Sequence, residues 1–221
     1  HGSLEAIKHM KTRGGGAIVN LGSELSDRSV PLQGLYSASK HAVKAFTDAL
    51  RMELEKEGAP LSVTLIKPAG IDTMFAVHAR NYMDKEPALP PPIYAPEVVA
   101  NAILYAARHP KRDVFVGGAS KAISSGAFAM PRVLDKFMNA SMFKQQQSDA
   151  PSPPNRRDAL HEPDPRNELR QRQGMDKHVA ERSAYTAVAL RSHKIMPALL
   201  GAGALFAAWK LTRRHSLRSA F

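Results

Sequence analysis

The sequence predicts an α/β fold built on a parallel sheet, the C-terminal half of a doubly wound sheet. Short apolar runs typical of buried strands occupy residues 17–21, 61–66 and 113–116. Apolar residues recur at helical spacing between these runs, over residues 36–57 and 96–108. A helix between successive strands makes the strands parallel neighbours, and three strands make only part of a doubly wound sheet.

The boundaries of these elements follow from local signals. Residues 4–10 predict the last turns of a helix, which ends in the three glycines at 14–16. The stretch over 22–34 is rich in Ser and Gly and predicts a loop. Gly58 and Pro60 stop the helix over 36–57, and Pro96 opens the next one.

Composition excludes several classes of protein. With 221 residues, 43% hydrophobic and 23% charged, the chain is long and apolar enough for a core, and it is not wholly disordered. The absence of cysteine excludes a disulfide scaffold, a cysteine zinc site and a thiol nucleophile. The nine histidines lack ligand spacing, so no metal site is predicted.

The basic charge lies in the second half of the chain. The net charge of +11 divides into +2 for residues 1–120 and +9 for residues 121–221. A basic tail suits nucleic acid, an acidic membrane surface, or solvent alone. Nucleic acid is disfavoured because acids interleave with the bases, aromatic residues make up only 6%, and no recognition motif occurs.

Three regions are predicted along the chain. A partial α/β domain over residues 1–143 precedes a disordered linker over 144–178, which lacks apolar periodicity. A basic tail over 179–221 contains 15 uncharged residues at 195–209, flanked by Lys and Arg. This apolar segment predicts a short helix that associates with a membrane, a helix docked on this or a partner domain, or a disordered stretch.

The residues that indicate chemistry are Ser23, Tyr36 and Lys40. Tyr36 and Lys40 stand four residues apart on a predicted helix, so their side chains share one face. A neighbouring ammonium stabilises a phenolate, which makes tyrosine a usable acid/base. Ser23 follows the strand over 17–21, where its hydroxyl could orient a carbonyl oxygen. The pattern therefore predicts proton transfer to or from an alcohol or carbonyl oxygen.

Three motifs carry a family resemblance. The segments NLGS at 20–23, YSASK at 36–40 and PAGIDT at 68–73 resemble, in order and spacing, the short-chain dehydrogenase/reductase family. The resemblance covers about residues 1–118. It implies a Rossmann-like fold, NAD or NADP as cofactor, and an alcohol/carbonyl pair as substrate.

The resemblance also implies roles for particular residues. Ser23 would position the substrate oxygen, Tyr36 would be the catalytic acid/base, and Lys40 would lower the pKa of Tyr36 and bind the nicotinamide ribose. The backbone of Ile71 would meet the carboxamide and Thr73 the region of the pyrophosphate. The complete implied cofactor set is Tyr36, Lys40, Pro68, Gly70, Ile71 and Thr73.

Other features of the family are expected upstream of His1. The Gly-rich phosphate loop, the residue that selects NAD or NADP, and the catalytic Asn do not occur in this sequence; the glycines at 14–16 precede a strand instead of following one. The chain is therefore predicted to be an N-terminally truncated fragment, inactive alone. The alternative is a non-catalytic scaffold, or a protein that binds a membrane or partner and retains the fold.

Partners and surroundings of the site are predicted as well. The resemblance implies a homo-oligomer formed through the helix over 36–57. The apolar segment at 195–209, with its flanking cations, predicts a cytoplasmic protein whose tail associates with a membrane surface. The prolines at 90–92 predict a rigid segment near the substrate mouth, or a polyproline ligand. A set of apolar residues either lines that pocket or simply packs: Met74, Phe75, Val77, Tyr82 and Met83.

Overall fold

The computed structural model describes residues 1–163, 170–174 and 177–191. Contacts divide the chain into a unit over His1–Thr186 and a second over Ala187–Phe221. Within the second unit only residues 187–191 are described, and they are helical. The architecture below is that of the first unit.

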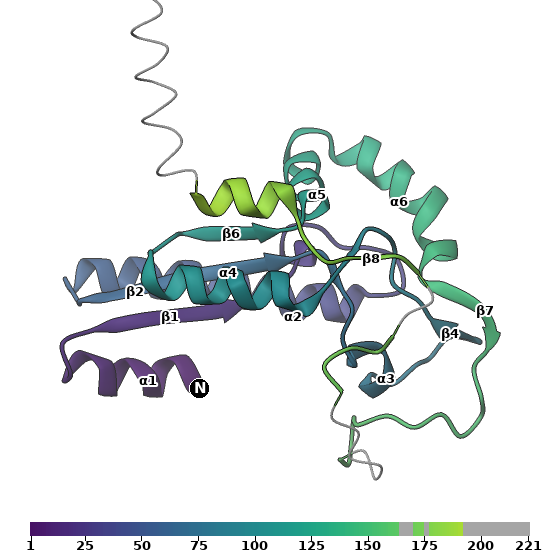
Figure 1. Cartoon of the computed structure of the whole chain (residues 1–221), viewed down its shortest axis with the longest axis horizontal. Helices are drawn as coiled ribbons and strands as arrows, with labels where there is room; N and C mark the ends of the chain where they lie inside the picture. The colour runs from purple at the N-terminus through teal and green to yellow at the C-terminus, as the bar shows by residue number, and fades with distance from the viewer. Residues whose placement is uncertain (164–169, 175–176, 192–221) are drawn as a thin grey trace, which may run out of the picture. The chain divides into compact units, whose positions relative to one another are not determined.

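A three-stranded parallel sheet forms the centre of this unit (Figure 1). Its strands are β1 (Gly16–Leu21), β2 (Leu61–Pro68) and β6 (Asp113–Val116), in the order β1-β2-β6. The register pairs Gly16 with Leu61 and Leu65 with Asp113. The predicted α/β fold with a parallel sheet is confirmed.

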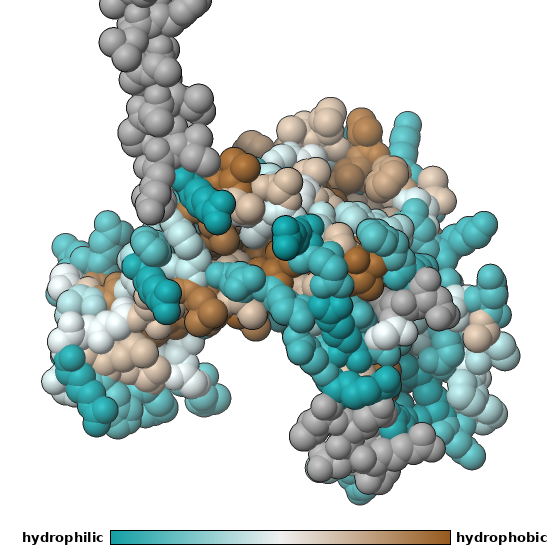
Figure 2. Space-filling model, in the orientation of Figure 1, coloured by the Kyte–Doolittle hydropathy of each residue, from teal (hydrophilic) through white to brown (hydrophobic). Residues whose placement is uncertain are grey.

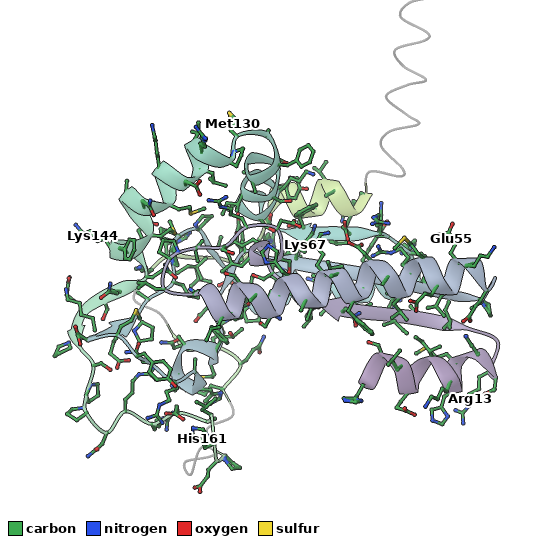
Figure 3. All side chains as sticks on the ribbon, turned by 180° about the vertical axis from the view of Figure 1, so that it is seen from behind. Arg13, Glu55, Lys67, Met130, Lys144 and His161 are labelled. Carbon is green, nitrogen blue, oxygen red and sulfur yellow. The ribbon has the colours of Figure 1, made fainter. Side chains whose placement is uncertain are left out.

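Helices pack on both faces of the sheet (Figures 1 and 3). On one face, α1 (Gly2–Lys11) and α2 (Gly34–Lys56) share a core with β1 and β2. On the other face, α4 (Pro96–Arg108) contacts all three strands. Ile66 and Leu65, neighbours on β2, point to opposite faces of the sheet and are both fully buried, so the central strand is covered on both sides. The core under α1 and α2 consists of Ile7, Ile18, Leu50, Leu54 and Val63.

Two helices that the sequence analysis did not define follow β6. These are α5 (Gly118–Ala129) and α6 (Pro131–Gln145). Their inner faces form a second core with the loop after β1, made of Leu25, Val30, Met138 and Met142. Apolar side chains also gather on the outer surface over these helices (Figure 2), among them the exposed Phe128, Met130 and Val133.

Several short elements complete the unit. The 3-10 helix η1 (Glu24–Ser26) follows β1, and α3 (Phe75–His78) follows the segment after β2. The short strands are β3 (Gly70–Ile71), β4 (Lys85–Pro87), β5 (Ile93–Tyr94), β7 (Gln147–Pro151) and β8 (Val179–Ala180).

The prediction of a disordered linker over 144–178 is wrong for the described part of that segment. Strand β7 lies within this segment and pairs antiparallel with β4. Strand β8 begins directly after the segment and pairs parallel with β5. The unit accordingly extends to Thr186, well beyond the predicted boundary at residue 143. Backbone hydrogen bonds and ion pairs hold this segment against the loop between β2 and α4. Such contacts leave no apolar periodicity in the sequence, so the pattern did not indicate them.

Arg156 is a main anchor of the segment after β7. Its Nε donates to both carboxylate oxygens of Glu86, at 2.9 and 3.0 Å. Its two terminal nitrogens donate to the carbonyl oxygens of Ala79 at 2.8 Å and Ala76 at 2.6 Å. One guanidinium thus ties the segment to the end of α3 and to β4.

We expect Arg156→Leu to release this segment. The change removes the donor of two carbonyls and leaves the part-buried carboxylate of Glu86 with only the hydroxyl of Ser152, which costs roughly 1–3 kcal/mol locally. Limited proteolysis of the folded protein should then cut residues 147–163 roughly tenfold faster, because cleavage follows the local opening free energy. The exposed Arg108 makes Arg108→Leu a matched control. Equal cleavage rates in both variants would contradict this account.

Within residues 1–163, 170–174 and 177–191, no helix is long and apolar enough to cross a membrane. The apolar segment at 195–209 lies outside the described residues.

Candidate active site

A cavity of about 810 Å³ opens where β1 and β2 end. Ligands bind at this edge in open α/β sheets, since the loops that follow the strands meet there. Segments from η1, α2, α4, α5, α6 and the prolines at 90–92 complete its wall. Every site residue predicted from the sequence lines this one cavity: Ser23, Tyr36, Lys40, Pro68, Gly70, Ile71 and Thr73.

Ser23 is buried and held by the turn that it begins. Its Oγ accepts from the backbone N–H of Leu25 at 3.1 Å, and its own N–H donates to Ser26 Oγ at 3.0 Å. The preceding residue, Gly22, donates its N–H to the carbonyl of Ile66 at 2.8 Å, which fixes the end of β1 to β2. The capping pattern therefore fixes the position of the Ser23 hydroxyl at the cavity wall.

Tyr36 lies in the first turn of α2, with its ring tilted by 55° against Phe75 at 5.4 Å between centroids. Burial raises the pKa of its phenol above 10.0, a hydrogen bond with Ser23 lowers it, and the charge of Glu24 raises it. The net shift of the Tyr36 pKa is upward, so the phenol is protonated at neutral pH.

Lys40 lies one turn further along α2. Its Nζ donates to the carbonyl oxygen of Leu21 at 3.0 Å and lies 5.8 Å from the centre of the Tyr36 ring. Burial lowers the pKa of Lys40. Burial of the phenol outweighs the hydrogen bond with Ser23, which is the contribution that lowers the pKa of Tyr36. A lowering of this pKa by Lys40 stays a prediction.

The segment after β2 runs along the cavity wall with its backbone fixed. The N–H of Ala69 donates to the carbonyl of Val116 at 2.9 Å, and that of Asp72 to the carbonyl of Tyr94 at 3.0 Å. A Cβ at Gly70 would stand 3.4 Å from the carbonyl oxygen of Pro90. This is an ordinary van der Waals distance, so the space at this position would also admit a Cβ.

All three prolines at 90–92 line the cavity. Their place at a substrate mouth stays a prediction. Of the five apolar residues expected either to line the pocket or to pack, only Phe75 is part of the lining. Met74 is buried outside it.

The sequence analysis missed two parts of the site. One is the apolar wall formed by α5 and α6, which includes Ile123, Phe137, Met138 and Met142. The other is Glu24, whose only sequence signal is that it directly follows Ser23. Burial raises the pKa of Glu24 from 4.5 to about 7.

In the described part of the chain, no group of three His, Asp or Glu side chains is placed to hold a metal ion.

The fold and cavity define an α/β protein with a serine, a tyrosine and a lysine at the carboxyl edge of a parallel sheet. Residues 1–83 match the family model described as short chain dehydrogenase. This chain belongs to the short-chain dehydrogenase/reductase family, a family of oxidoreductases.

Relatives with curated names include further oxidoreductases. The chain is 45% identical over 164 residues to uncharacterized oxidoreductase YxnA of Bacillus subtilis (strain 168). That alignment covers 73% of this chain and 46% of YxnA. It is 33% identical over 144 residues to uncharacterized oxidoreductase YbbO of Escherichia coli (strain K12). That alignment covers 62% of this chain and 53% of YbbO. The chain thus spans about half the length of the curated relatives it matches.

Solved structures also align with the chain. A short-chain dehydrogenase from Burkholderia cenocepacia J2315, solved in complex with NADP, is 28% identical with a TM-score of 0.49. The alignment covers 62% of this chain and 54% of that one.

Proposed function

We propose that the protein containing this chain is an NAD(P)-dependent oxidoreductase that interconverts an alcohol and a carbonyl compound, with Tyr36 as the acid/base. The observation that carries the proposal is that Ser23, Tyr36 and Lys40 line one cavity with mostly apolar walls. Membership of an oxidoreductase family supports it. The scaffold alternative is not favoured, because it gives no reason for these three side chains to meet.

Each of the three residues has a distinct task in this proposal. The Ser23 hydroxyl holds the substrate oxygen, and the Tyr36 phenol donates its proton to that oxygen as the carbonyl is reduced. In the reverse direction the phenolate accepts the proton of the alcohol. The raised pKa of Tyr36 keeps the phenol protonated near neutral pH, which suits the reductive direction.

The cavity has groups that fit a nicotinamide nucleotide. When bound, the nicotinamide supplies the hydride donor or acceptor. Lys40 would hold the ribose hydroxyls through its ammonium group, which already reaches a backbone carbonyl at the cavity edge. Pro68, Gly70, Ile71 and Thr73 would hold the nicotinamide side, where a fixed backbone and one hydroxyl meet apolar walls.

We expect Lys40→Met to weaken cofactor binding by roughly tenfold or more, since a hydrogen bond from a charged group contributes about 1.5–3 kcal/mol. Titration of the whole protein with NADH and NADPH, followed by fluorescence, measures the dissociation constants. Lys56→Met is the matched control, because Lys56 is an exposed residue at the far end of the same helix. Unchanged affinity for both nucleotides in Lys40→Met would remove Lys40 from the cofactor site.

The assembly is also a proposal. The family resemblance implies a homo-oligomer formed through α2, and this helix exposes Leu35, Phe46 and Met52. The predicted contact of residues 195–209 with a membrane stays a prediction.

A further inference from the structure

Glu24 is a carboxylic acid at the reacting end of the cavity that the proposed reaction does not use. It directly follows Ser23, begins η1 and lines the same cavity as Tyr36 and Lys40. Among the described residues that line this cavity, these three are the only titratable ones. The charge of Glu24 acts on the phenol, since it raises the pKa of Tyr36.

One oxygen of the Glu24 carboxyl group lacks a hydrogen-bond partner in the part of the chain that the structure describes. This atom, Oε2, is buried. The cavity wall around η1 is otherwise apolar and includes Leu25, Val30 and Met138. An unpaired buried polar atom costs folding free energy, and such costs concentrate where a ligand supplies the missing partner.

Other polar side chains do not satisfy this need. Gln33 also lines the cavity, but its Nε2 donates to Gln146 Oε1 at 2.5 Å. Lys40 donates to the carbonyl of Leu21. The Glu24 carboxyl therefore keeps a buried oxygen without a partner among the described residues, beside the proposed position of the substrate oxygen.

We propose that Glu24 is a specificity-determining residue that binds a hydroxyl group of the substrate, located within a few atoms of the reacting carbonyl carbon. The inference rests on the proposed function of the same cavity. It assigns the substrate to the class of hydroxylated ketones and the corresponding diols, with an otherwise apolar body that matches the apolar wall.

A hydroxyl matches this carboxyl better than other polar groups. Because the pKa of Glu24 lies near 7, both protonation states are present under neutral conditions. A hydroxyl accepts a hydrogen bond from the protonated acid and donates one to the carboxylate, so it satisfies Glu24 in either state. A carbonyl oxygen could not pair with the carboxylate, and an ammonium group would leave the O–H of the protonated acid without an acceptor.

The test compares ketones that differ only by a hydroxyl in place of a methyl group. The two pairs are α-hydroxyacetophenone with propiophenone, and β-hydroxypropiophenone with butyrophenone. Calorimetric binding to the protein that contains this chain gives the affinity ratio within each pair. Turnover with NADH or NADPH is measured separately. The wild type should bind the hydroxylated member of at least one pair roughly tenfold more tightly, the size of one buried hydrogen bond to a carboxyl group.

Glu24→Leu should abolish that ratio, and Glu24→Gln should retain part of it because the amide still donates and accepts. Folding is not expected to suffer, since Glu24→Leu removes an unpaired buried polar atom; its melting temperature should equal or exceed that of the wild type. Glu55→Leu is the matched control, because Glu55 is exposed at the far end of α2 (Figure 3).

The outcomes separate the two claims. An equal affinity ratio in the wild type and Glu24→Leu overturns the role of Glu24, whatever the turnover. Preferential binding without turnover of any ketone leaves Glu24 as a hydroxyl-binding residue and overturns the proposed reaction. A ratio lost in Glu24→Leu and kept in Glu55→Leu supports the inference.

Discussion

Tyr36→Phe should lower turnover of the alcohol/carbonyl reaction by roughly a hundred- to ten-thousandfold, the usual contribution of a positioned general acid. The phenol is the group placed to give a proton to the substrate oxygen, and phenylalanine keeps the ring that packs against Phe75. Cofactor binding should change little, because the contact of Lys40 with the carbonyl of Leu21 does not involve the phenol. Steady-state kinetics of the whole protein, with nucleotide titration, measure both effects.

The exposed Tyr82 provides the control, since Tyr82→Phe removes a phenol that lies outside the cavity. The pH profile adds a second criterion. Alcohol oxidation needs the phenolate, so in the wild type its rate should still be rising above pH 10.0, because the pKa of Tyr36 is raised above that value. Tyr36→Phe should lose this rise. Turnover of Tyr36→Phe within tenfold of the wild type would exclude Tyr36 as the acid/base.

The sequence predicted the elements that carry the site because each has strong local signals. The bounds of α4 and β6 agree with the prediction, since Pro96 opens the helix and Gly117 follows the strand. The stretch over 36–57 has a long apolar stripe, and α2 occupies nearly the same residues. Motif residues at the ends of these elements met in one cavity because parallel strands end at one edge.

The parts that the sequence did not predict depend on contacts distant in the chain. Strands β7 and β8 pair through their backbones with β4 and β5, and side-chain periodicity does not record such pairing. The shifts of the pKa of Tyr36 and Glu24 arise from burial, which involves residues from several elements. Glu24 directly follows Ser23, but no pattern in the sequence indicates that it lines the cavity.

Lys67→Met should destabilise the fold by about 3 kcal/mol, because removing one partner of a buried ion pair leaves the other charge uncompensated. Lys67 is only 3% exposed and lies near the middle of the unit in the view of Figure 3. Its Nζ stands 2.9 Å from Asp27 Oδ2, 3.7 Å from Asp113 Oδ2 and 4.1 Å from the centre of the Phe115 ring. One ammonium thus joins the loop that follows Ser23 to β2 and β6.

The pKa of Asp27, the ion-pair partner of Lys67, predicts how the loss of stability in Lys67→Met depends on pH. Burial opposes ionisation of Asp27, but hydrogen bonds from Ser124 and Lys67 hold its pKa below 3.8. A depressed carboxyl pKa contributes stability above the unfolded-state pKa, and this contribution is lost as pH falls through the folded-state pKa. In Lys67→Met the pKa of Asp27 should rise, so the deficit relative to the wild type should be largest near pH 7 and shrink as Asp27 becomes protonated in acid.

Urea unfolding of the whole protein at neutral and acidic pH measures these differences. Lys67→Met combined with Asp27→Asn should lose less stability than Lys67→Met alone, because the double variant leaves no uncompensated charge at Asp27. Lys121→Met is the control, since the exposed Lys121 lies over the same Phe115 ring at 4.6 Å. If the Lys67→Met and Lys121→Met variants unfold at the same urea concentration at pH 7, the ammonium of Lys67 does not hold this part of the fold together.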